Sequence, residues 1–156
     1  MTFTSPTKGV MTFERMFTDI MDYVHASPND DYRLIVGTDS HSRDDIAFVT
    51  AVIVHRVGKG ARYYYRRRRQ RAMPSLRQRI YYETSLSLGV GSKLAECLAE
   101  NGHANVNVEI HIDVGQQGET KDLIREIVSM VVYSGFDAKI KPNSFGASKV
   151  ADKYTK

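Results

Sequence analysis

The fold is decided by residues 33–71, RLIVGTDSHSRDDIAFVTAVIVHRVGKGARYYYRRRRQR, which predict three consecutive strands. Residues 33–38 form a short apolar run, and residues 46–57 are rich in the β-branched side chains that strands favour. The turn-forming sequence SRDD joins these two runs as a hairpin, and a glycine-containing turn leads to a third strand over 61–71. Three strands before any crossover helix predict an antiparallel set.

Helices and strands alternate outside this set. Apolar residues recur at spacings of three and four over residues 12–27, which predicts an amphipathic N-terminal helix. On the other side, Ser75-x-x-Gln78 is a capping-box signature that opens a long helix ending near Asn101. The remaining expected elements are a strand over 106–112, a helix over 120–132, a strand over 136–140 and a last helix from Ser144.

The predicted order is a helix followed by βββαβαβα. Because later strands alternate with helices, they are expected to pair in parallel with the first set. The fold class is therefore α/β, with a mixed five-stranded sheet flanked by helices. A length of 156 residues suits one domain over 1–156, with the 12–27 helix packed on it.

Charge is distributed unevenly along the chain. Lys and Arg number 22 against 18 Asp and Glu, a net charge of +4. Residues 56–82 hold ten of the positive side chains and no acid, so the rest of the chain carries 12 positive and 18 negative charges, a net of −6. The sequence thus describes an acidic domain with one basic strip.

Composition excludes several classes of protein. A hydrophobic fraction of 42% excludes a disordered chain. No apolar run approaches the ~20 residues of a membrane span, and the first residues lack the apolar region of a signal peptide. We therefore expect a cytoplasmic protein without a membrane partner. The single Cys97 excludes a disulfide framework and is interpreted as a buried, inert thiol.

Four acids stand out by position. Asp39 follows the first strand and Asp113 ends the 106–112 strand, where ligand sites form in α/β sheets, although an acid there can also simply start a turn. Glu83 falls within the apolar stripe of the long helix, where a carboxylate needs a metal or a salt bridge to an arginine of the basic strip. Asp152 lies in the last helix, where a surface acid is the plain alternative.

These acids have a common chemical use. Carboxylate oxygens suit Mg²⁺ or Mn²⁺, and two such ions about 4 Å apart can activate a water and stabilise the leaving oxygen in phosphodiester cleavage. Without a metal, clustered acids would repel one another. The set therefore favours divalent-cation binding.

The element order and the acids together resemble the ribonuclease H-like superfamily. More closely, the chain resembles its YkuK-type family, a bacterial family of unknown function. The resemblance is carried by Gly37-Thr-Asp-Ser-His41, His111-Ile-Asp-Val-Gly115 with Gly118-Glu-Thr-Lys121, and Lys141-Pro-Asn-Ser144 with Val150-Ala-Asp-Lys153. It implies a βββαβαβα core with carboxylates on the first strand, first core helix, fourth strand and last helix. Asp39, Glu83, Asp113 and Asp152 occupy those places in that order.

Other residues near the predicted centre carry weaker signals. His41 and His111 flank it as ligands, proton shuttles or phosphate contacts, or else as structural histidines. Thr120 and Lys121 at a helix start suit a phosphate. The glycines before them lack the spacing of a P-loop, so a P-loop nucleotide site is not predicted.

The basic strip has two interpretations. Arg66, Arg67, Arg68, Arg69 and Arg71 can hold a phosphate backbone of RNA, RNA–DNA hybrid or DNA. Because residues 66–69 alternate faces on a strand, they cannot all contact one ligand, and charges on an edge strand also discourage aggregation.

The residues and the resemblance together suggest three functions that experiments can distinguish. The first is a metal-dependent nuclease or phosphodiesterase with the four acids as catalytic metal ligands. The second is a non-catalytic nucleic-acid-binding module on the same fold. The third is phosphotransfer or nucleotide hydrolysis, which this fold class also supports.

Overall fold

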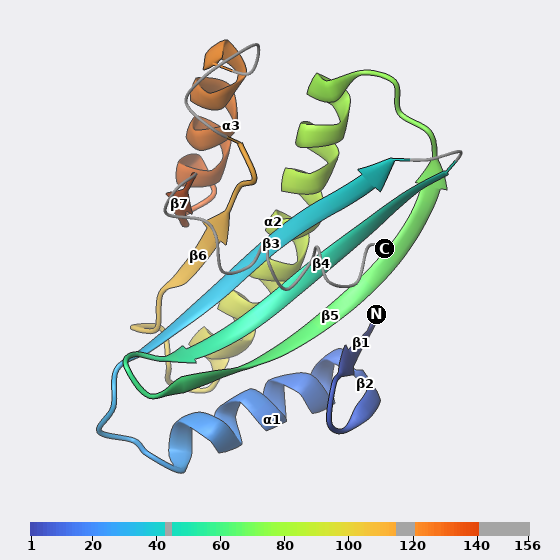
Figure 1. The fold of residues 1–156 in the computed structure, drawn as a ribbon. Helices are drawn as coiled ribbons and strands as arrows, with labels where there is room; N and C mark the ends of the chain where they lie inside the picture. The colour runs from blue at the N-terminus through green and yellow to red at the C-terminus, as the bar shows by residue number, and fades with distance from the viewer. Residues whose placement is uncertain (43–44, 115–120, 141–156) are drawn as a thin grey trace.

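The computed structural model describes residues 1–42, 45–114 and 121–140 (Figure 1). Within them, seven strands form one sheet in the order β2-β1-β5-β4-β3-β6-β7. The central strands β3 (Tyr32–Ser42), β4 (Asp45–Arg56) and β5 (Gly60–Arg71) are antiparallel. Strands β6 (Val108–His111) and β7 (Asp137–Lys139) continue the sheet in parallel. The α/β class and the mixed sheet are confirmed.

The sheet has two strands more than the five predicted. The additional strands are β1 (Thr2–Ser5) and β2 (Gly9–Thr12), an antiparallel hairpin that joins β5 at Thr4↔Tyr65. Each strand is only four residues long and mostly polar or exposed, so neither produces a clear alternating pattern. The hairpin also means that β5 has neighbours on both sides at Tyr65, rather than lying at the sheet edge there.

Strand β3 is longer than predicted. It continues through Asp39 to Ser42, because its antiparallel ladder with β4 runs unbroken from Tyr32↔Arg56 to Ser42↔Ile46. Asp39 therefore lies within the strand instead of following it. Asp113, by contrast, comes two residues after the end of β6.

Three described helices pack on the sheet: α1 (Phe13–His25), α2 (Leu76–Glu100) and α3 (Lys121–Tyr133). The capping prediction is confirmed, because the Ser75 hydroxyl accepts the Gln78 N–H at 3.3 Å. None of the described helices is long and apolar enough to cross a membrane. The predicted last helix lies outside the described residues.

One hydrophobic core lies between these helices and one face of the sheet. Leu34 and Val36 of β3 contribute to it, together with apolar residues of all three helices. Helix α2 comes close to β6, since a Cβ added at Gly91 would lie 3.0 Å from Ile110 Cδ1. The apolar stripe of α2 is buried as predicted except at Leu76, the first helical residue, which is 46% exposed.

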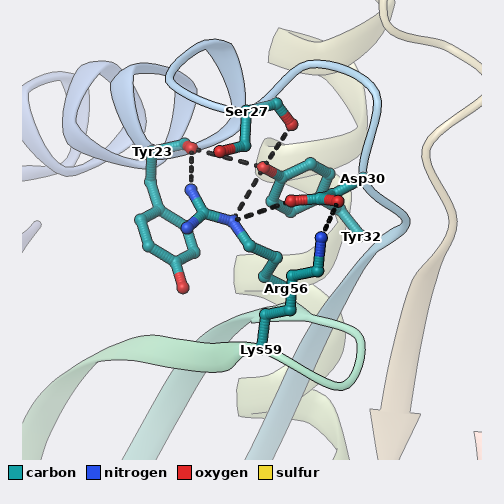
Figure 2. A network of polar contacts seen from close by, with 6 residues as sticks. All are labelled: Tyr23, Ser27, Asp30, Tyr32, Arg56 and Lys59. Carbon is teal, nitrogen blue, oxygen red and sulfur yellow. Dashed lines mark hydrogen bonds and ion pairs between the residues drawn. The ribbon is translucent and has the colours of Figure 1, made fainter.

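An arginine fastens the end of α1 to the sheet (Figure 2). Arg56 donates to the Tyr23 carbonyl at 2.8 Å and to the Tyr32 hydroxyl at 3.0 Å, with its guanidinium 4.0 Å from the Tyr23 ring centroid. Asp30 lies 3.8 Å from Arg56 and accepts from Lys59 at 2.7 Å. Two cations of the basic strip, Arg56 and Lys59, thus stabilise the fold.

Candidate functional site

The sheet brings two of the predicted acids to neighbouring strands. Strands β3 and β6 pair in parallel, and the last paired residues are Gly37 and His111. Asp39 comes two residues after Gly37 in the sequence, and Asp113 comes two residues after His111. Because parallel neighbours run in step, both acids lie at the edge where the pairing of β3 with β6 ends, although β3 itself continues past Asp39 to Ser42.

Helix α2 brings Glu83 to this edge. Thr38 of β3 is hydrogen-bonded to Ser87 of α2, with 2.7 Å between the hydroxyl oxygens, and both residues are buried. One turn earlier on the helix, the Glu83 carboxylate accepts a hydrogen bond from the Ser40 hydroxyl. Arg79 donates to the same Ser40 oxygen at 3.1 Å. A ladder of polar contacts therefore fixes Glu83 against β3.

The Glu83 carboxyl is in an unfavourable place for a charge. Burial raises the pKa of the Glu83 carboxyl to about 8, and the negative charges of Asp39 and Asp113 add to the rise. The Ser40 hydrogen bond and the positive charge of Arg79 oppose it without cancelling it. Among the described residues Arg79 contacts Ser40 and acts on Glu83 only through its charge, so the predicted salt bridge to an arginine of the basic strip is not formed as a direct ion pair.

Asp39 and Asp113 approach Glu83 differently. Thr38 and Ser40 contact α2, so the alternation of the strand sends the Asp39 side chain to the other face of β3, from where its charge still acts on Glu83. Asp113 lines a small cavity together with Glu83, Thr84 and Ser87. Glu83 and Asp113 thus border the same space.

A comparison with protein families matches a model described as ribonuclease H-like to residues 15–156. The chain belongs to the ribonuclease H-like family. It is also 34% identical, over 166 aligned residues, to the uncharacterized protein YkuK of Bacillus subtilis (strain 168). That alignment covers 99% of this chain and 96% of its relative. The family resemblance drawn from the sequence is confirmed.

Part of the predicted ribonuclease H-like centre lies outside the described residues. Asp152 and Thr120 lie outside the described residues. The side chains of His41 on β3 and of Lys121, the first residue of α3, are likewise not described. In the ranges 1–42, 45–114 and 121–140, no three His, Cys, Asp or Glu side chains are grouped closely enough to hold a metal. The four-acid metal centre therefore stays a prediction.

His111 is engaged within the sheet. It is 7% exposed, and its Nε2 atom lies 3.3 Å from Oε1 of Glu109, which is itself only 6% exposed. Arg33 lies 3.7 Å from the other Glu109 oxygen. His111 also lines the small cavity with Glu83 and Asp113, so its roles as a site residue and as a structural histidine both stay predictions. Glu109 was not singled out in the sequence, although an acid between buried strand positions was a signal for it.

Ser40 and Arg79 were also missed. Arg79 precedes Glu83 by four residues, the helical spacing at which opposite charges meet, so its effect on Glu83 was open to prediction. Ser40 gave no such signal, because its contact with α2 depends on tertiary packing.

The register divides the arginines of this ribonuclease H-like chain between two faces. Asp39 pairs with Val49 and Val49 with Arg67, so Arg67 lies on the same face of the sheet as Asp39. By alternation, Arg69 and Arg71 share that face. Arg66 and Arg68 lie on the face of α1 and α2, as do their strand neighbours Tyr64, which contacts Asp19, and Gln70, which contacts Tyr82.

Proposed function

We propose that this protein is a divalent-metal-dependent nuclease or related phosphodiesterase. Asp39, Glu83, Asp113 and Asp152 would hold Mg²⁺ or Mn²⁺, with Asp39 and Asp113 as the central ligands. The observation that carries the proposal is the half-buried Glu83 carboxyl, whose pKa is raised to about 8 by desolvation and by the charges of Asp39 and Asp113. Membership of the ribonuclease H-like family supports an activity related to nucleic acid.

The electrostatics of Glu83 fit a cation. At neutral pH the Glu83 carboxyl holds a proton for much of the time, because burial and the nearby acids disfavour its charge. Glu83, Asp39 and Asp113 would repel one another less with a divalent cation between them, and Glu83 would release its proton when the cation binds. The chemistry that a bound cation would supply is activation of water and stabilisation of charge on the departing phosphodiester oxygen.

Neighbouring side chains prepare the carboxylate for this task. Ser40 donates to one Glu83 oxygen, Oε2, and Arg79 holds the Ser40 hydroxyl in turn. Such supporting contacts fix the orientation of a metal ligand, and their loss typically costs about 10- to 100-fold in affinity or activity. Ser40 and Arg79 are therefore positioning residues for Glu83.

The arginines on the face of Asp39 are placed to hold the substrate. Arg67, Arg69 and Arg71 are at least partly exposed, and Arg67 lies in the same cross-strand row as Asp39. Alternate strand residues point to one face about 7 Å apart, so these three form a row of positive charge for a phosphate backbone. The substrate class is RNA, RNA–DNA hybrid or DNA.

A non-catalytic nucleic-acid-binding module is the second candidate. It is favoured by the observation that the described residues contain no group of three potential metal ligands. In such a module the Ser40 hydrogen bond to Glu83 would be a purely structural contact. It predicts salt-sensitive binding without turnover and no stabilisation by divalent ions.

Cleavage assays distinguish the two functions. Purified protein is incubated with RNA–DNA hybrid, RNA and single-stranded DNA in the presence of Mg²⁺ or Mn²⁺. The nuclease proposal predicts cleavage of at least one substrate, and a loss well beyond ~100-fold in Asp39→Asn or Asp113→Asn. Asp137→Asn, at an exposed acid of β7, is the matched control and should keep full activity. Binding without cleavage of any substrate would support the non-catalytic module.

A further inference from the structure

A second polar site lies beside the N-terminal hairpin, away from the acids. A cavity of about 480 Å³ opens between the β1–β2 loop, α1 and β5, lined by Ser5, Thr7, Lys8, Asp19, Arg62 and Tyr64 among others. Tyr64 is six residues along β5 from Gln70, which contacts Tyr82 next to Glu83. Six strand residues span about 20 Å, so this cavity is separate from the carboxylate cluster.

A buried carboxylate organises the cavity. Asp19 is 6% exposed, and its two oxygens accept hydrogen bonds from Lys8 and from the buried Tyr64 hydroxyl. Arg62 lies 3.6 Å from the oxygen that Lys8 contacts. Burial alone would raise the pKa of Asp19, but the Lys8 and Tyr64 hydrogen bonds and the two positive charges lower it. Asp19 is thus ionised and holds two cations in place.

The cavity has more positive charge and more donors than Asp19 can use. Lys8 and Arg62 carry two charges against one, and their side chains are 49% and 43% exposed. A lysine offers three N–H donors and an arginine five. Arg62 is further fixed by the Tyr23 ring, whose centroid lies 4.8 Å from its guanidinium carbon. The Ser5 and Thr7 hydroxyls, 3.4 Å apart, add polar groups to the wall.

We propose that this cavity binds the phosphoryl group of a phosphate monoester, with Lys8 and Arg62 as its ligands and Asp19 as the positioning residue. Three phosphoryl oxygens match a guanidinium fork beside an ammonium group. The volume falls within the range of small-molecule sites, so the rest of the ester fits inside. A free nucleotide and a phosphorylated end of a nucleic-acid strand share this chemistry. The site does not depend on the proposed nuclease.

Calorimetric titration in EDTA tests the proposal, because EDTA removes any metal that could bind a phosphate at the acids. Adenosine 5′-monophosphate and inorganic phosphate should bind, whereas adenosine should not. Lys8→Gln and Arg62→Gln should each weaken binding roughly 10- to 150-fold, since each removes a hydrogen bond to a charged group. Lys8→Arg should retain binding. Lys59→Gln, at a lysine paired with Asp30 outside the cavity, is the matched control.

Two further measurements complete the test. A phosphate-dependent rise in the melting temperature of the unmodified protein, absent with adenosine, needs no variant to fold. If a 5′-phosphate strengthens the binding of an oligonucleotide, relative to the same oligonucleotide with a 5′-hydroxyl, a strand end is assigned as the source. If the 5′-phosphate makes no difference while adenosine 5′-monophosphate still binds more tightly than adenosine, a free ester is assigned. Absence of phosphate-dependent binding to the unmodified protein, or unchanged binding in a folded Lys8→Gln/Arg62→Gln variant, overturns the proposal.

Discussion

Asp19 and Glu83 are both carboxylates in desolvated places, and the chain treats them in opposite ways. Two cations and a tyrosine hydroxyl surround Asp19, and its pKa is lowered. Glu83 accepts a hydrogen bond from one hydroxyl. The negative charges of two further acids act on it, and its pKa is raised to about 8. One site has a surplus of positive charge and the other a surplus of negative charge.

Asp19 has cationic partners within the protein, whereas Glu83 has no ion-pair partner among the described residues. Burying a carboxylate costs free energy in both places, and at Asp19 the chain itself supplies the compensating charge. At Glu83 the described residues supply only the more distant charge of Arg79. In our proposal a divalent cation from solution would provide the compensation that Glu83 lacks, and an anion would balance the surplus cations at Asp19.

Removal of the Asp19 carboxylate should produce a larger loss of stability than removal of the Glu83 carboxylate. Asp19→Ala leaves the Tyr64 hydroxyl, in a residue only 1% exposed, without its acceptor, so the free energy of unfolding should fall by about 2–3 kcal/mol. Urea unfolding measures the change. Asp22→Ala, at an exposed acid of the same helix, should change it by less than about 0.5 kcal/mol. An equal fall in the free energy of unfolding for both substitutions would show that the contacts of Asp19 do not stabilise the fold.

Glu83 should make the metal-free protein less stable as pH rises. Its folded pKa of about 8 lies above the ordinary value of 4.5, so the stability that its protonated form contributes is complete below pH 4.5 and is lost as pH rises toward 8. Between pH 6 and 7 the unmodified protein should lose roughly 1 kcal/mol relative to Glu83→Gln. Glutamine can still accept the Ser40 hydrogen bond. Thermal melts in EDTA across this range measure the difference. Parallel pH profiles for both proteins would show that ionisation of Glu83 does not destabilise the fold.

The arginines of β5 should show the smallest effect. Reversing Arg67 and Arg69 to glutamate should reduce the slope of log binding constant against log salt by about 1 for each phosphate that the protein no longer neutralises. Arg66→Glu/Arg68→Glu, with the same change in charge on the opposite face, is the matched control and should alter the slope less. Equal slopes for the two double variants would mean that net charge, and not the face shared with Asp39, governs binding.

The sequence is informative wherever a local period determines the side-chain direction. The helical stripe of α2 is sufficient to direct Glu83 toward the sheet, and the Ser75 cap marks where that helix begins. The alternation of β5 divides its arginines between two faces, although only the strand register identifies which of them share a face with Asp39.

Features that depend on distant parts of the chain were missed. The β1–β2 hairpin is short and polar, and the surroundings of Asp19 depend on that hairpin and on Arg62 of β5. The extension of β3 through Asp39 depends on pairing with β4. Local propensity contains no information about such partners, so neither the Asp19 cluster nor the strand position of Asp39 followed from the sequence.

The central claim is that the acids around Glu83 are incomplete without a divalent cation, and a Mn²⁺ titration followed by thermal melting tests it most directly. For the unmodified protein, Mn²⁺ at about 100 times its dissociation constant should add about 2.7 kcal/mol of stability, a rise of several degrees in melting temperature. The rise should be much smaller in Asp39→Asn and Asp113→Asn and unchanged in Asp137→Asn. No rise in the unmodified protein, or an equal rise in all four proteins, would contradict the claim.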